Sequence, residues 1–369
     1  MSRRSTWVRH PFFSLSFVAG SCALWLFLAT ASAAMPQTEE EIANYRAGDR
    51  QEVLEAGAKK EGAVQIYGTG AQIQPLVDAF AKKYPFVKIT FFRGDGPAVT
   101  RRFFEEYKTA RYTVDVLDVG STSLVTIRDL NLSFLQPFQS PEMASMRQEA
   151  IEMGATGPLW ANNYESYLNL GYNTKALSEG EVPRTYDDLL DPKWRGRMAM
   201  AGSSGLVNWI GAALAEKGEP YIRKLGAQDI KIFNVAGRAM SNLVVSGEVP
   251  LSPAIYDSHM IASQGEGASV SWRPLGGTYA TTGGVALALN APHPHAAMLY
   301  IDFMISKVGQ EMYKTIGYAS ARTDVESTKQ RPSKVYYLAQ QPNYAEDYEK
   351  WSDLGRQVFG KGETPAPSK

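Results

Sequence analysis

The sequence predicts an α/β protein with two lobes, and three observations lead to that prediction. The chain has 369 residues, which is longer than a typical domain of about 100–150 residues. Short apolar strands, small-residue turns and amphipathic helices alternate along it, as they do in parallel sheets covered by helices. The same alternation resumes after an interruption near Pro158. Each lobe is therefore expected to be a mostly parallel sheet flanked by helices.

The first α/β block follows a helical, initially acidic segment at 37–62. Apolar residues spaced three and four apart predict its helices, and short apolar or alternating runs predict its strands. The expected order is strand 64–67, helix 73–80, strand 87–91, a helix ending at Lys108, strand 114–119 and helix 124–130.

The second block has the same pattern and is followed by elements that are expected to return to the first lobe. Its expected elements are a long, partly exposed strand 162–173, a turn-rich stretch 183–196, strand 198–201, helix 206–217, strand 230–235, helix 237–246, strand 251–256 and a helix from Asp257. Strand 283–289 and one long helix, 294–316, come next, and the tail from Gln330 is expected to be helical.

Composition and charge exclude several classes of protein. Lysine plus arginine and aspartate plus glutamate both number 38, so no basic surface for nucleic acid is expected. Cys22 is the only cysteine, which excludes a disulfide scaffold and a thiolate metal site. Gly68 and Gly70 begin a dinucleotide fingerprint that Ile73 does not complete. Without a nucleophile elbow or a P-loop, we expect neither a cofactor nor catalytic residues.

The N-terminus has the features of a secretion signal. Arg3, Arg4 and Arg9 precede an uncharged apolar run, which closes on the small-residue sequence Ala31-Ser32-Ala33. We predict that residues 1–33 are a cleaved signal peptide that directs the chain to the periplasm. A retained membrane anchor is the alternative, and the adjacent arginines leave both the general and the twin-arginine export routes open.

Small residues recur where strands end and helices begin. The first turn of a helix has unpaired N–H groups and a partial positive charge, so converging helix starts can bind an anion. Ordinary helix capping is the alternative for any single turn. Arg238 lies at a helix start, where a cation opposes the helix dipole unless an anion is present. The predicted ligand-binding residues are Thr69, Gly70, Ser121, Thr122, Ser203, Ser204, Arg238 and Tyr256.

Six stretches together carry a resemblance to a known family. They are AGAKKEGAVQIYGTG, QPLVDAFAKKYPFVKITF, VDVLDVGSTSLV, TYDDLLDPKWRGRMAM, VVSGEVPL and HAAMLYIDFMISKVGQEMYKTIGY. In this order they resemble the type II periplasmic solute-binding proteins of ABC importers (extracellular solute-binding protein family 1), in the group related to bacterial ferric-ion-binding proteins. The resemblance covers most of residues 50–350.

The resemblance implies a two-lobed periplasmic-binding-protein fold, type II, whose lobes are joined by crossover hinge strands and close on the ligand. The implied divisions are an N-terminal extension 34–49, a first lobe 50–158 plus 275–350, a second lobe 159–274 and a C-terminal tail 351–369. We therefore expect a monomer that captures a small-molecule solute and delivers it to the permease of an ABC transporter in the inner membrane.

The identity of the solute stays open at this point. Ferric-ion binders of the family carry two adjacent tyrosines shortly after a Gly-Glu-Val stretch, whereas here Gly247-Glu248-Val249 is followed by Tyr256 alone. The absence of the second tyrosine favours a small anionic solute over ferric iron, namely a phosphate, a phosphonate or a carboxylate. The alternatives are ferric iron held by Tyr256, Asp257 and His259 with a synergistic anion, and a transferase built on the same fold.

Overall fold

The structure is a computed structural model that describes residues 36–70, 73–131, 134–326, 331–337, 340–341, 343–360 and 363–364. The predicted signal peptide, residues 1–33, lies outside these ranges. Within them, no helix combines the length and the apolar character needed to cross a lipid bilayer.

The first part of the chain folds into the strand–helix pairs that the sequence predicts. The strands are β1 (Ala63–Gly68), β2 (Lys88–Arg93) and β3 (Val116–Gly120), paired in parallel in the order β2-β1-β3. The helices are α1 (Glu39–Ala43), α2 (Arg50–Glu61), α3 (Gln74–Lys83), α4 (Gly96–Lys108) and α5 (Ser121–Asn131). The helical spacing and the turns between them are local features of the sequence, which is why they predict these elements well.

The second part of the chain contains another parallel sheet. Its strands are β7 (Ala199–Ala201), β8 (Lys231–Phe233) and β13 (Glu363–Thr364). The helices around it are α6 (Ser204–Lys217), α7 (Glu219–Leu225), α8 (Gly237–Ser246), α9 (Asp257–Gly265) and α12 (Tyr344–Phe359). Short 3-10 helices are η2 (Pro141–Ser145), η3 (Gln148–Ala150), η4 (Asp187–Leu190), η5 (Pro192–Trp194) and η6 (Gly226–Gln228).

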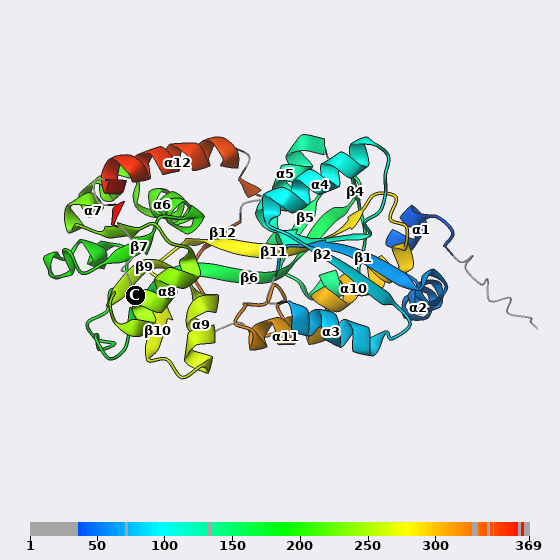
Figure 1. Ribbon diagram of the computed structural model, residues 1–369, viewed down its shortest axis with the longest axis horizontal. Helices are drawn as coiled ribbons and strands as arrows, with labels where there is room; N and C mark the ends of the chain where they lie inside the picture. The colour runs from blue at the N-terminus through cyan, green and yellow to red at the C-terminus, as the bar shows by residue number, and fades with distance from the viewer. Residues whose placement is uncertain are drawn as a thin grey trace, which may run out of the picture. The chain divides into compact units, whose positions relative to one another are not determined.

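Two long antiparallel strands, β6 (Pro158–Asn173) and β11 (Thr278–Ala288), run side by side between these two parts (Figure 1). Near its start β6 pairs with β5 (Ile151–Met153), and near its end it pairs with β9 (Leu251–Tyr256) and β10 (Val270–Arg273). β11 also pairs with β3, β4 (Leu135–Gln136) and β12 (Val335–Tyr337). The expected partial exposure of β6 is wrong: all but one of its residues are buried, because strands flank it on both sides.

The buried side chains form separate cores on the two sides of these strands. One group includes Phe80, Phe103 and Tyr300 and lies among β1–β3, α3, α4 and the helix α10 (Pro294–Ile305). The other includes Trp194 and Met240 and lies around β7–β9, α6 and α8. We call these two parts the first and the second lobe; together they form the two-lobed α/β fold that the sequence predicts.

The single long helix expected at 294–316 is instead two helices, α10 and α11 (Lys307–Thr315). Ser306 between them has extended backbone angles, and its hydroxyl accepts a hydrogen bond from the Gly309 amide. Serine is a preferred N-cap residue, so it begins a new helix within an otherwise continuous apolar pattern.

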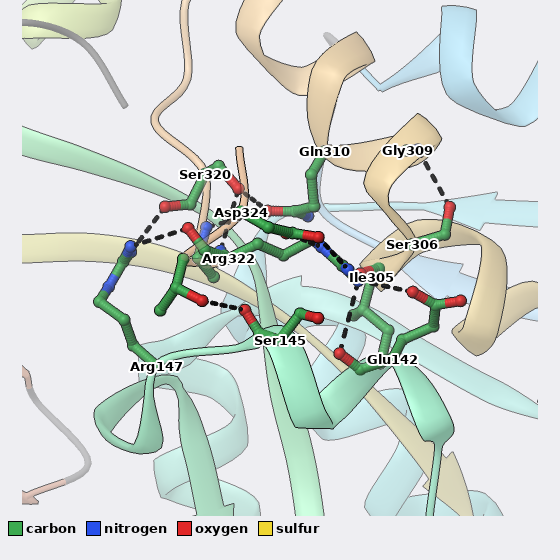
Figure 2. A network of polar contacts seen from close by, with 12 residues as sticks. Glu142, Ser145, Arg147, Ile305, Ser306, Gly309, Gln310, Ser320, Arg322 and Asp324 are labelled. Atoms are coloured by element: carbon green, nitrogen blue, oxygen red, sulfur yellow. Dashed lines mark hydrogen bonds and ion pairs between the residues drawn. The ribbon is translucent and has the colours of Figure 1, made fainter. Parts of the chain in front are cut away.

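An ionic network around the buried Arg322 side chain fixes the segment that follows α11 (Figure 2). The Arg322 guanidinium is 5% exposed and pairs with Glu142 at 2.5 Å and with Asp324 at 2.7 Å. Arg147 donates a hydrogen bond to the Ser320 carbonyl oxygen and also pairs with Glu165, in the middle of β6, at 2.6 Å. The network thus ties the segment after α11 to the η2–η3 region and to a connecting strand.

Candidate functional site

A cavity of about 440 Å³ lies between α5 of the first lobe and the second-lobe elements that face it. We call it the cleft cavity. Hydroxyl and amide side chains from several elements line it, among them Thr122 and Thr126 of α5, Ser204 and Asn208 of α6, Tyr256 of β9 and Thr281 of β11. The cavity therefore offers many hydrogen-bonding groups from both lobes, as a ligand site requires.

Three helices begin at the cleft cavity. α5 starts at Ser121 and α6 at Ser204, and α9 starts directly after Tyr256. Neither Ser203, which precedes α6, nor Tyr256, which precedes α9, makes a side-chain hydrogen bond to the first turn of its helix. The partial positive charge at the start of α6 is therefore not offset by a side-chain cap, whereas the first turn of α9 contains the Asp257 carboxyl group.

Tyr256 presents its hydroxyl group at this cavity. The Thr281 hydroxyl donates a hydrogen bond of 3.0 Å to the Tyr256 oxygen, which leaves the Tyr256 proton available to a ligand. Burial raises the pKa of Tyr256 above its usual value, so the side chain stays a neutral phenol at physiological pH.

Asp257 and His259 of α9 do not line the cleft cavity. One Asp257 oxygen accepts hydrogen bonds from the Ser166 hydroxyl and from the amides of Tyr167 and Ser258, at 2.8–3.0 Å. Burial raises the pKa of Asp257 to about 7. Burial and, in second place, the positive charge of Arg238 lower the pKa of His259 to about 4.

In the part of the chain that the structure describes, no group of three or more His, Cys, Asp or Glu side chains is arranged to hold a metal ion.

The other predicted ligand residues lie in several places. The Thr69 hydroxyl accepts a hydrogen bond of 3.1 Å from the Gly120 amide and so joins the ends of β1 and β3. Gly70 and Ser121 lie near these strand ends, outside the cavity lining. The Arg238 guanidinium donates to the His259 carbonyl oxygen at 3.3 Å and lies 3.7 Å from a Glu266 oxygen. Arg238 thus bridges α8 and α9 rather than lining the cleft cavity.

A second cavity, of about 350 Å³, lies between α6 and α12, and we call it the α6–α12 groove. Ser203 lines this groove, whereas Ser204 and Tyr348 line both the groove and the cleft cavity. Most of α12 lies in the predicted C-terminal tail 351–369, and none of its residues is among the predicted ligand-binding residues. The spacing of Tyr344, Tyr348 and Trp351 on one helical face was the signal that could have identified it as a packed helix.

Two carboxylates and a further tyrosine complete the cleft cavity. Asp129 of α5 and Glu349 of α12 both line it. Tyr344 of α12 lines it as well and donates a hydrogen bond of 2.9 Å to the Asn208 side-chain oxygen. α12 therefore contributes to the same cavity as the strand and helix ends that the sequence singles out.

Comparisons with known proteins agree with this fold. Residues 128–346 match the family model described as bacterial extracellular solute-binding protein. The Fe(3+)-binding periplasmic protein of Serratia marcescens is 24% identical over 272 residues, which are 70% of this chain and 78% of that protein.

Two solved structures illustrate the fold. Iron-bound HitA from Pseudomonas aeruginosa has a TM-score of 0.65 and 21% identity, and the match covers 79% of this chain and 99% of HitA. The periplasmic binding protein AfuA from Actinobacillus pleuropneumoniae, with exogenous fructose-6-phosphate bound, has a TM-score of 0.57 and 22% identity, covering 81% and 97% of the two chains. These relatives and neighbours are solute-binding proteins and not enzymes.

Proposed function

Because the chain belongs to the bacterial extracellular solute-binding proteins, we propose that it captures a small anionic solute in the cleft cavity. It is a periplasmic substrate-binding protein of an ABC transporter, and it hands the solute to the membrane permease. The solute class is a phosphate, a phosphonate or a carboxylate.

The observation that carries the proposal is the meeting of helix starts at one cavity lined from both lobes. The starts of α5 and α6 reach it through Thr122 and Ser204, and Tyr256 adds a phenolic hydroxyl. Backbone N–H groups at helix starts and neutral hydroxyl donors suit an anionic oxygen cluster. A ligand held from both sides also stabilises the closed arrangement of the lobes.

The rest of the cavity suits the uncharged part of such a solute. Asn208 and Thr281 can hydrogen-bond to hydroxyl groups, and the carboxylates of Asp129 and Glu349 can accept hydrogen bonds from hydroxyl or amino groups. The sugar phosphate bound in AfuA is one solute of this kind.

The test is a titration of the purified protein with phosphate, phosphonate and carboxylate probes and with neutral sugars. At about a hundredfold over its dissociation constant, a true ligand should stabilise the protein by about 2.7 kcal/mol. Ser204→Glu places a carboxylate at the first residue of α6, where it should weaken anion binding by about a hundredfold, because a like charge in a binding site costs several kcal/mol.

The matched control is Gln74→Glu, since Gln74 is the first residue of α3 and lines neither cavity. It should leave anion binding unchanged. Binding of neutral sugars alone, or equal anion affinity in Ser204→Glu and the wild type, would contradict an anion site.

Ferric iron is a second candidate solute, favoured by the tyrosines of α12. Tyr344 and Tyr348 line the same cavity as Tyr256, and Glu349 adds a carboxylate. Phenolate and carboxylate oxygens are hard ligands that suit Fe(III). A visible absorption band on adding ferric citrate, lost in Tyr256→Phe, would support this candidate, and a colourless protein would exclude it.

Export to the periplasm also belongs to the proposal. It is supported by the charged start, the apolar run and the small-residue sequence Ala31-Ser32-Ala33.

A further inference from the structure

The first half of α12 forms an aromatic wall of the cleft cavity. Tyr344 and Tyr348 are four residues apart and therefore lie on one face of the helix, and both line the cavity. Their ring centroids are 5.7 Å apart. Glu349, the next residue along the chain, lines the cavity as well. We call Tyr344, Tyr348 and Glu349 the tyrosine wall.

The packing of α12 on α6 holds the tyrosine wall in position (Figure 1). The Tyr344 hydroxyl donates its hydrogen bond of 2.9 Å to the Asn208 side-chain oxygen, and the Tyr344 ring centroid lies 6.1 Å from that of Trp351. Gly211 of α6 faces the Trp351 ring so closely that an added Cβ would lie 2.5 Å from a ring carbon. Because α12 cannot shift without losing these contacts, the tyrosine wall is preorganised for a ligand.

No neighbouring cation neutralises the Glu349 carboxylate. This side chain is exposed and forms no ion pair with the described residues, and Lys350 beside it pairs with Glu346 and Asp347 instead. Burial and, in second place, the charge of Glu349 raise the pKa of Tyr348, so the carboxylate lies near the Tyr348 phenol group. The tyrosine wall thus combines aromatic rings with an unpaired negative charge.

The described residues that line the cleft cavity include acidic side chains and no lysine, arginine or histidine. Asp129 is already paired with Arg128 at 2.8 Å, which leaves Glu349 as the acidic side chain without a partner. A solute with negative charge alone would meet this like charge without compensation, which weakens binding. A positive group of the solute, placed at the tyrosine wall, would remove that cost.

We propose that the solute carries an ammonium group in addition to its anionic head, and that the tyrosine wall binds this group. The inference rests on the proposed function, because it requires the head to bind at the starts of α5 and α6, beside Thr122 and Ser204. Tyrosine rings attract cations to their faces, and the Glu349 carboxylate accepts charge-assisted hydrogen bonds from an ammonium group. With a doubly charged phosphate or phosphonate head, such a solute remains anionic overall.

The test compares probes that differ only in this group. 2-Aminoethyl phosphate is matched with propyl phosphate, and 3-aminopropyl phosphate with butyl phosphate, so that each pair exchanges an ammonium group for a methyl group. At pH 8 all four heads are doubly charged, because the second phosphate pKa is about 6, and the amino groups stay protonated, as lysine does with a pKa of about 10. Isothermal titration calorimetry on the whole protein should show that, in at least one pair, the amino probe binds about tenfold more tightly than its methyl counterpart.

Two variants test whether the tyrosine wall causes this preference. Tyr348→Leu removes an aromatic ring and keeps an apolar side chain, and Glu349→Gln removes the charge and keeps the shape. Each should reduce the preference to about threefold or less, since each removes about half of the interaction with the ammonium group. The ratio within a pair is the readout, because the loss of a negative charge in Glu349→Gln also strengthens binding of every phosphate head.

The matched control is Glu346→Gln, the same substitution on the same helix at an exposed residue that lies outside the cleft cavity. It should keep the full preference for the amino probe.

The outcomes separate this inference from the proposed function. If the alkyl phosphates bind and neither amino probe binds more tightly than its methyl counterpart, the ammonium site is wrong and the anion site stands. A preference that both Tyr348→Leu and Glu349→Gln retain in full would also overturn the ammonium site. If none of the four probes binds, the phosphate site of the proposed function fails and the ammonium site fails with it.

Discussion

The buried carboxyl group of Asp257 predicts a defined change of stability with pH. Asp257 is 1% exposed, and burial raises its pKa from 3.8 to about 7. Between these two values the folded protein keeps a proton that the unfolded chain releases, so the free energy of unfolding falls as the pH rises. The slope for one proton is about 1.4 kcal/mol per pH unit, which amounts to roughly 4 kcal/mol over the window from pH 4 to pH 7.

Asp257→Asn should remove this dependence with little change in packing. The amide oxygen can still accept the hydrogen bonds from Ser166, Tyr167 and Ser258, and the amide nitrogen replaces an oxygen that has no partner among the described residues. The unfolding free energy of the variant minus that of the wild type should therefore increase from pH 4 to pH 7 and level off above pH 7.

Urea unfolding followed by tryptophan fluorescence, at half-unit steps from pH 4 to pH 8, measures this difference. Asp118 and His259 also have shifted pKa values, at about 6 and about 4, but they are present in both proteins and cancel in the difference. Asp78→Asn, at an exposed carboxylate on α3, serves as the control and should follow the wild-type curve. If the Asp257→Asn and wild-type curves run parallel from pH 4 to pH 7, the reasoning about this buried carboxyl group is refuted.

Three further predictions concern the connecting network, α12 and the N-terminus. Arg147→Ala leaves the buried Glu165 carboxylate without its ion pair and should destabilise the protein by about 3–5 kcal/mol in urea unfolding; adding Glu165→Gln should recover part of that loss, and no recovery would contradict the pairing. Gly211→Ala places a methyl group against the Trp351 ring and should cost about 1–3 kcal/mol through overpacking, whereas an unchanged unfolding midpoint would mean that α12 is not packed this way. Protein exported by its host should begin at residue 34 or 35 in intact-mass analysis, and a periplasmic form that retains Arg9 would show that the predicted cleavage is wrong.

Local sequence patterns were sufficient for β1–β3 and α3–α5 of the first lobe. The spacing of Leu76, Val77 and Phe80 describes one face of α3, and such spacing depends only on neighbours in the chain. The break at Ser306 was missed because the apolar pattern continues across it, although a serine within such a pattern is a recognisable cap signal. The burial of β6 could not be predicted locally, since it depends on pairing with strands far along the chain.

The sequence could predict those site residues that lie where a strand ends and a helix begins. Thr122, Ser204 and Tyr256 each lie at the start of a helix, and the structure brings all three to one cavity. Arg238 has the same local signature, but its side chain turns to the His259 carbonyl oxygen, a direction that depends on the packing of α8 against α9. The position of α12 depends on its close approach to Gly211 of α6. This contact joins distant parts of the chain, so local sequence patterns do not reveal it.

Native mass spectrometry of protein purified gently from the cells that export it tests the central claim most directly. The account predicts one small anionic solute per chain in the wild type, lost in Ser204→Glu and retained in Gln74→Glu, because only the first substitution places a negative charge in the cleft cavity. A bound ferric ion, a neutral solute, or an anion that Ser204→Glu retains in full would contradict it.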